Sequence, residues 1–227
     1  MIIDDIKKEV SILLNGEKSG HGMDHIKRVL DLSNKLAIGL DIDNLVLSSI
    51  ALLHDVDDYK LFGDEASKKL PNARRILDKY NLDDSVKKKI LESISEIGYS
   101  KRLAGIKPKY LEGMIVSDAD MLDAMGASGI TRSIEYALSK GRKIFDKDIF
   151  PKLDLDSNGY KNEKDTTMIN HVFEKLLRLK NLMLTENAKE EAIKRHEFMV
   201  NFLKEYFDEL NLKDWQDYLI EYLSNLN

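Results

Sequence analysis

The stretch that decides the fold is Ala51-Leu-Leu-His-Asp-Val-Asp-Asp-Tyr-Lys60, or ALLHDVDDYK. It continues an apolar run whose spacing predicts a buried helix, with Asp43 placed to cap the start of that helix. The stretch then sets a histidine, three carboxylates and a lysine within seven residues. Burying His54 and Asp55 at the end of an apolar helix is costly unless another group compensates them. The rest of the chain must therefore supply that group.

Composition limits what this group can be. The chain has 227 residues, enough for one large or two small domains, and no cysteine. Disulfides, Cys-ligated zinc and thiolate nucleophiles are thereby excluded, and any metal must be bound by His, Asp or Glu. A net charge of −5 gives no basic field for a nucleic-acid polymer or an anionic membrane. We find neither a secretory signal nor a long apolar segment, and expect a cytoplasmic protein.

Helical periodicity recurs along almost the whole chain, whereas strand alternation hardly occurs. We predict an all-α protein forming a single compact domain, with no strong helical stretch interrupted by proline. The last third reads as two long helices and then a short one. The predicted helices cover residues 2–14, 25–40, 43–54, 65–80, 84–96, 111–125, 130–140, 166–184 and 186–210, and one more precedes Asn227.

A second group of carboxylates lies in VSDADMLDAMGASGI, residues 116–130. Asp120 and Asp123 are one helical turn apart and share a face, while Asp118 points elsewhere. A solvated acidic face is the ordinary interpretation, but the glycine-rich residues 126–129 favour close helix packing instead. Acidic groups amid tight packing need a cation as partner.

The remaining candidates are histidines in SGHGMDHIKRV, where His21 and His25 are four residues apart. On one helix they would share a face. Alternatively, His21 lies in the loop before the helix and caps it, while His25 is a hydrogen-bonded core histidine. The segment lacks the H-E-x-x-H zinc signature, because Gly22 and Met23 follow His21.

His25, the His54-Asp55 pair and an aspartate near 120 thus come from three separated elements. Adjacent residues of a helix diverge by about 100°, so His54 and Asp55 can serve one ion only if their helix passes close beside it. Two imidazoles and two carboxylates suit Mn, Fe, Co, Ni or Mg, with open positions for water and substrate.

This pattern resembles the HD-domain superfamily of metal-dependent phosphohydrolases. HGMDHIKRV, ALLHDVDDYK and SDADMLDAMGASGITR look like the core motifs of its bacterial stand-alone branch, which includes nucleotide pyrophosphohydrolases, and residues 169–199 resemble that branch's C-terminal helices. The resemblance implies an HD-domain helical bundle. Residues 1–20 would form an N-terminal helix, residues 21–125 the metal-binding core, and residues 126–227 the helices that complete the same domain and its pocket.

Residue by residue, the resemblance implies one divalent ion held by His25, His54, Asp55 and Asp120, with Asp118 as the fallback for the fourth ligand. Asp58 would manage the attacking water as a catalytic residue. The branch commonly has a tryptophan between positions 21 and 25, where this chain has Met23 and Asp24. The rim of the pocket therefore differs from that of the branch at these positions, and the identity of the leaving group is left undecided.

The resemblance also supplies cations that would offset phosphate charge, namely Lys60 as a catalytic residue and Arg132 as a substrate contact. Further substrate contacts would come from His21 and from the neighbours His171 and Lys175 in INHVFEKLL. As an isolated pair, His171 and Lys175 would instead be ordinary surface residues. His196, in KRHEF, is expected on the surface.

Residues 154–165 nearly fit the calcium-binding EF-hand loop, with Asp154, Asp156, Asn158 and Gly159 at the right spacing. Position twelve is Asp165 instead of glutamate, and position eight is Lys161 instead of an apolar residue. A polar loop rich in Asp and Asn explains the pattern as well.

These observations favour a divalent-metal-dependent hydrolase of a small phosphorylated substrate, preferably a nucleotide, of pyrophosphohydrolase or phosphatase type. A metal-activated water would attack the phosphorus. Two alternatives stay open: a regulatory module that binds a nucleotide without turnover, and a di-iron oxygenase on the same scaffold, which would need Asp58 and His21 as extra ligands. The expected partner is the small substrate, and a homodimer is possible.

Overall fold

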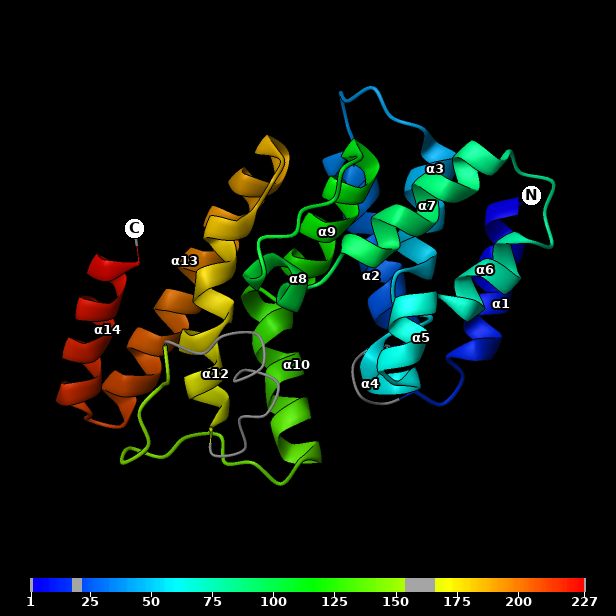
Figure 1. Ribbon diagram of the computed structural model, residues 1–227. Coiled ribbons are helices and arrows are strands. Elements are labelled where there is room, and N and C mark those ends of the chain that lie inside the picture. The colour runs from blue at the N-terminus through cyan, green and yellow to red at the C-terminus, as the bar shows by residue number, and fades with distance from the viewer. Residues whose placement is uncertain (1, 18–21, 154–165, 227) are drawn as a thin grey trace. The chain divides into compact units, whose positions relative to one another are not determined.

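The computed structural model describes residues 2–17, 22–153 and 166–226, and every regular element within these ranges is a helix (Figure 1). The all-α prediction is confirmed. None of the described helices has both the length and the apolar character needed to cross a bilayer. The chain divides into two compact units, Met1–Asp123 and Ala124–Asn227.

The first unit contains the first nine helices. They are α1 (Ile2–Leu13), α2 (Met23–Leu36), α3 (Asn44–Leu53), α4 (Tyr59–Phe62), α5 (Asp64–Lys69), α6 (Pro71–Leu77), α7 (Asp84–Glu96), α8 (Tyr99–Leu103) and α9 (Leu111–Asp123).

Helix α3 is the centre of this unit, because α1, α2, α7 and α9 all pack against it. Seven of its ten residues are buried, as expected for a helix that is apolar on all sides. Asp43 caps it as predicted: the carboxylate accepts hydrogen bonds from the N–H groups of Leu45 (2.8 Å) and Val46 (3.2 Å). The apolar run therefore fixes the position at which the chain leaves the core, directly before His54.

Helix α9 is tied to the same centre by a buried carboxylate. Glu112 is 3% exposed, and its Oε1 accepts from the Asp43 N–H (2.9 Å) and from Lys89 Nζ of α7 (2.7 Å). One residue later, a Cβ at Gly113 would lie only 2.8 Å from Ser93 Oγ, so glycine allows α7 and α9 to approach closely. These contacts fix how α9 presents the aspartates near its C-terminus.

The prediction of one helix over residues 65–80 is wrong. The segment forms α5 and α6, separated by Leu70 in the left-handed conformation (φ 53°, ψ 50°). The cause is Pro71, which disfavours the α conformation in the residue before it and has no N–H to continue the helix. The expectation that proline interrupts no helical stretch fails at this position.

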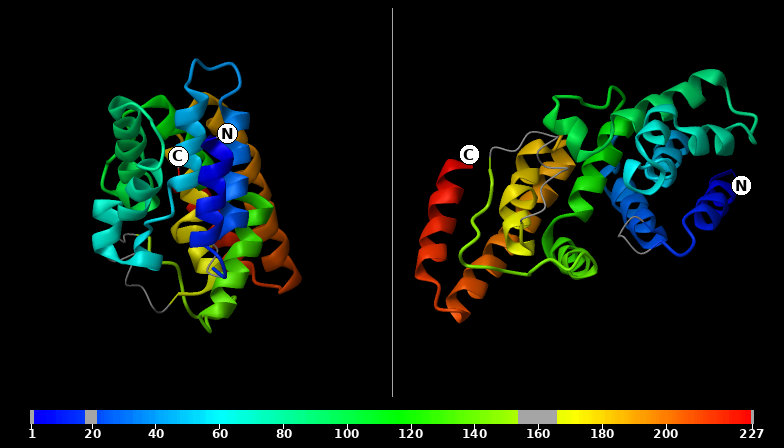
Figure 2. Two further views of the ribbon diagram at one scale, coloured as in Figure 1. Left: turned by 90° about the vertical axis from the view of Figure 1, so that its right-hand side faces the viewer. Right: turned by 60° about the horizontal axis from the view of Figure 1, so that its bottom comes forward.

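The second unit contains α10 (Gly126–Ser139), α12 (Met168–Glu174), η1 (Leu176–Leu182), α13 (Glu186–Glu209) and α14 (Lys213–Asn225). The predicted helix over residues 166–184 is broken at Lys175 (φ −132°, ψ −60°), beyond which the chain continues as a 3₁₀ helix. Helices α13 and α14 pack against each other as a hairpin, visible in Figure 1 and in the right-hand view of Figure 2. The core of the second unit contains an aromatic cluster, in which Trp215 of α14 lies among Phe145, Phe173 and Phe207.

The expectation that His196 lies on the surface is also wrong. The side chain lies on the inner face of α13 and the residue is 7% exposed. Burial and, to a smaller extent, the charge of Lys180 lower the pKa of His196 to about 4, although a hydrogen bond with the Leu177 backbone opposes the shift. The imidazole is therefore neutral in the folded protein at pH 7.

This buried histidine predicts a loss of stability in acid. Between pH 6.5 and about 4 the unfolded chain binds a proton at His196 and the folded chain does not, so its contribution to stability falls as pH falls. The loss approaches roughly 3 kcal/mol at pH 4. Urea unfolding at pH 7 and pH 4.5 should show a smaller pH dependence for His196→Gln than for the unmodified protein. Equal pH dependence in the two proteins would contradict the assignment.

Candidate metal centre

Two buried histidines of the first unit face each other. His25 lies in the first turn of α2 and is 3% exposed, and His54 follows the last residue of α3 and is 8% exposed. Their Nε2 atoms are 3.2 Å apart. The structure thus brings together two side chains that are 29 residues apart in sequence.

The other ring nitrogen of each histidine is occupied. His25 Nδ1 lies 2.7 Å from Asp123 Oδ2, and His54 Nδ1 lies 2.9 Å from the carbonyl oxygen of Ala51. A carboxylate and a carbonyl can only accept, so each Nδ1 carries a proton and donates it. In the neutral imidazoles, both Nε2 atoms therefore keep lone pairs, and these point at one another.

Two carboxylates complete the group. Asp120 Oδ1 and Asp55 Oδ2 each lie 3.4 Å from His25 Nε2, and Asp55 Oδ1 lies 3.6 Å from His54 Nε2. The ligand atoms of His25, His54 and Asp120 all lie within 4.8 Å of one another. Four electron-rich groups thus converge on one small volume.

This arrangement fits a divalent cation. Nitrogen and oxygen ligands about 2.0–2.2 Å from one ion lie roughly 3.0–3.5 Å from each other, which is close to the separations observed here. Two imidazoles with two carboxylates form a ligand set that accepts first-row divalent metals. Facing lone pairs at 3.2 Å repel each other unless a proton or a metal ion lies between them.

The electrostatics of the protein without metal agree with this interpretation. Burial lowers the pKa of His25, but hydrogen bonds to Asp120, Asp123 and Asp55 outweigh it and raise that pKa well above its ordinary value. Burial raises the pKa of Asp120, and the hydrogen bond from His25 and the charges of both histidines lower it overall. The cluster favours a positive charge at its centre.

Helix α3 ends directly before the His-Asp pair. Its last residue is Leu53, and residues 54–57 form a turn. His54 itself keeps a helical backbone (φ −62°, ψ −29°), and both side chains still reach the site: His54 Nε2 lies 3.2 Å and Asp55 Oδ2 lies 3.4 Å from His25 Nε2.

The three aspartates of α9 have different surroundings. Asp120 faces the histidines, whereas Asp118 is fully buried and interacts electrostatically with Arg102 of α8. Asp123 accepts from His25 and also from Arg28, whose Nε lies 2.6 Å from Oδ1. Asp120 and Asp123 thus both contact His25, as expected for two residues one turn apart on the same face of a helix.

Arg28 was missed in the sequence. It is three residues after His25 on α2 and therefore shares its face, which is the only signal the sequence gives. A carboxylate that orients a ligand histidine is a common arrangement at metal sites, and Arg28 in turn holds that carboxylate.

The predicted catalytic and substrate-contact residues have fewer described contacts than the proposed metal ligands. Asp58 is half-buried before α4, and its N–H donates to the Asp55 carbonyl (3.1 Å). Arg132 on α10, His171 on α12 and Lys175 after α12 are half-buried residues of the second unit. Three further predictions fall outside the described part of the chain: His21, the calcium-loop candidate at 154–165 and the side chain of Lys60.

The sequence matches the HD domain family over residues 22–125. Over 203 residues it is 31% identical to YpgQ of Bacillus subtilis, an uncharacterized protein, covering 89% of this chain and 90% of that protein. A crystal structure of YpgQ in complex with ADP superimposes with a TM-score of 0.71 at 27% identity, covering 92% of this chain and 94% of that chain.

Two further solved structures are similar over nearly their whole length. A protein of Lactobacillus plantarum is 33% identical with a TM-score of 0.81, and the match covers 92% of this chain and 97% of that chain. An HD-superfamily hydrolase of Bacillus thuringiensis is 32% identical with a TM-score of 0.71, and the match covers 92% and 96%.

Proposed function

The chain belongs to the HD-domain family, and from this premise we propose that it is a divalent-metal-dependent phosphohydrolase of a small phosphorylated substrate, preferably a nucleotide. The observation that carries the proposal is the convergence of the ligand atoms of His25, His54 and Asp120 within 4.8 Å of one another, with Asp55 Oδ2 3.4 Å from His25 Nε2. The hydrolase name of the Bacillus thuringiensis relative and the ADP bound by YpgQ support the reaction class and the kind of ligand.

In this proposal the four residues hold one divalent ion: Mn, Mg, Co, Ni or Fe. When bound, such an ion lowers the pKa of a coordinated water and stabilises charge on a phosphoryl oxygen. The chain's own contribution is positional. Asp123 and the Ala51 carbonyl fix the ring orientation of the two histidines, so that the Nε2 atoms meet without rearrangement.

Asp58 is proposed to accept the proton of the attacking water. Its backbone is fixed to that of Asp55, so the two carboxylates come from one rigid turn. The family resemblance assigns Lys60 and Arg132 to the compensation of phosphate charge, and His21, His171 and Lys175 to substrate contact. These assignments stay predictions.

The test is a matrix of ions and substrates. Purified protein, stripped of metal, is given Mn, Mg, Co, Ni or Fe with a panel of nucleoside mono-, di- and triphosphates, and released phosphate and pyrophosphate are measured. We expect product with at least one ion and none in excess chelator. Nucleotide binding by calorimetry without any product would identify a regulatory module instead, and oxygen consumption with iron would identify an oxygenase.

A further inference from the structure

Asp57, the middle carboxylate of His54-Asp55-Val56-Asp57-Asp58, is directed away from the metal cluster. The residue is 1% exposed. Its Oδ1 accepts the N–H of Asn72 (3.0 Å), and its Oδ2 accepts the N–H of Ala73 (2.9 Å). Both oxygens are thus engaged by the first turn of α6.

Helix α6 needs an external cap. Leu70 occupies its N-cap position and has no side-chain oxygen, and Pro71 has no N–H. The N–H groups of Asn72 and Ala73 would therefore lack the acceptor that a serine or aspartate at the N-cap position normally supplies. Asp57 supplies it from 15 residues earlier in the chain.

A third hydrogen bond runs in the opposite direction. Asn72 Nδ2 donates to the carbonyl oxygen of Val56 at 3.0 Å. The backbone of Val56 and the side chain of Asp57 are thus both bonded to the start of α6. These are the two residues that follow Asp55 directly, so the bonds fix the path of the chain next to a proposed ligand.

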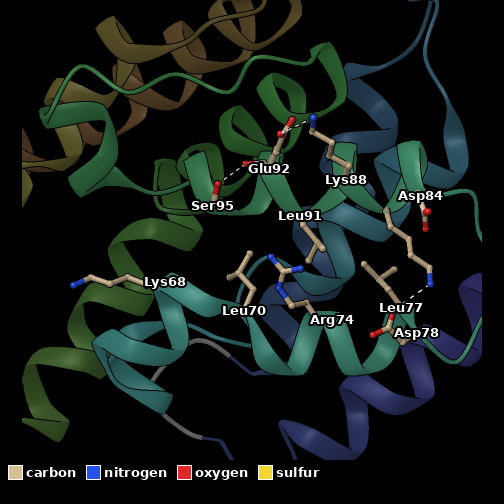
Figure 3. A pocket seen from close by; sticks show the side chains of 11 residues that line it. Lys68, Leu70, Arg74, Leu77, Asp78, Asp84, Lys88, Leu91, Glu92 and Ser95 are labelled. Carbon is tan, nitrogen blue, oxygen red and sulfur yellow. Dashed lines mark hydrogen bonds and ion pairs between the residues drawn. The ribbon is translucent and has the colours of Figure 1, made fainter.

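Helix α6 packs against α1 and α7, and a groove lies between it and α7. Figure 3 shows Leu70 and Leu77 on the α6 side of a groove of about 510 Å³, opposite Leu91 of α7. Arg74 lies on this side of α6, and its Nε donates to the Lys69 carbonyl, not to any part of the 54–58 turn. Arg74 is therefore a control position on the same helix that has no bond to the 54–58 turn.

We propose that Asp57 and Asn72 are positioning residues, which hold the His-Asp turn against α6 so that Asp55 faces the two histidines. The inference rests on the proposed metal site and gives the three carboxylates of the turn separate tasks. Asp55 binds the ion, Asp58 handles the water, and Asp57 holds the turn. Loss of residues that orient metal ligands typically weakens metal binding by about 10- to 100-fold.

The test compares Asp57→Asn and Asn72→Ala with two controls. In Asp57→Asn an amide NH₂ replaces one accepting oxygen and opposes an N–H donor, whereas Asn72→Ala removes only the bond to the Val56 carbonyl. Arg74→Ala changes the opposite side of the same helix. Leu36→Ala opens a cavity about 16 Å along α2 from His25 and reproduces a loss of stability without changing the turn.

The readouts are Co²⁺ affinity from its visible absorption, Mn²⁺ affinity from calorimetry, and the melting temperature without metal. We expect Asp57→Asn to bind both ions about 10- to 100-fold more weakly and Asn72→Ala to shift in the same direction by less. Both controls should keep the affinity of the unmodified protein, although Leu36→Ala melts earlier.

If Asp57→Asn and Asn72→Ala both bind metal with the same affinity as the unmodified protein, the positioning role is overturned and the proposed function stays intact. The same holds if affinity falls in Leu36→Ala as much as in Asp57→Asn, because the effect would then follow stability alone. Absence of metal binding by the unmodified protein would overturn both proposals.

Discussion

Replacing His54 or Asp120 by alanine is expected to remove the divalent ion and abolish turnover. Each substitution deletes one of the four proposed ligands, and the three that remain cannot complete the set. Metal content after dialysis, calorimetric titration with Mn²⁺ and product release from the best nucleotide measure the three expected losses. Full metal occupancy in both variants would show that the ion, if any, binds elsewhere.

Asp118→Ala is the matched control, because Asp118 lies two residues from Asp120 on the same helix. It is fully buried and interacts with Arg102, so its removal leaves that guanidinium without this charge. We expect a loss of stability of about 1–3 kcal/mol with metal affinity retained. If Asp118→Ala lost the ion and Asp120→Ala kept it, the fourth ligand would be assigned two residues too late.

The parts of the structure that could be predicted from the sequence are those encoded by local patterns. Asp43 precedes an apolar run, and the helix starts there. Asp120 and Asp123 are one turn apart and share the face that meets His25. The apolar run also predicts the extent of this helix, because the predicted range 43–54 exceeds α3 (Asn44–Leu53) by one residue at each end.

The errors have local physical causes. Residues 65–80 have helical periodicity throughout, but periodicity does not register that Leu70 cannot be helical before Pro71. His196 lies among charged neighbours in sequence, yet the helix turns it inward. Exposure was predicted from the polar neighbours of His196 in sequence. Its burial is instead decided by the face of α13 on which it lies.

The site residues that escaped prediction depend on long-range hydrogen bonds. Arg28 meets Asp123 across 95 positions, and Asp57 meets α6 across 15. No rule of sequence spacing predicts either hydrogen bond, because both depend on how the helices pack. In the sequence, Asp57 is one of three equivalent carboxylates, and only the burial and bonding of its oxygens distinguish it.

Asp58→Asn is expected to lower kcat by about 10²- to 10⁴-fold, the usual contribution of a general base. The amide has nearly the same shape but cannot take a proton from water at neutral pH. The backbone bond from Asp58 to Asp55, and those from Leu61 and Phe62 to the Asp58 carbonyl, do not depend on the side chain. Mn²⁺ affinity and melting temperature should therefore stay unchanged while kcat falls.

The contrast with Asp57→Asn makes this prediction specific. The two substitutions make the same chemical change at adjacent positions, but Asp57 is buried and bonded to α6, whereas Asp58 is half-buried. Asp57→Asn should weaken metal binding, and Asp58→Asn should lower kcat at saturating metal and flatten the acid side of the pH–rate profile, because deprotonation of Asp58 would no longer limit the rate there. An Asp58→Asn variant with the kcat and pH profile of the unmodified protein would remove Asp58 from the mechanism and require another acceptor for the proton of the attacking water.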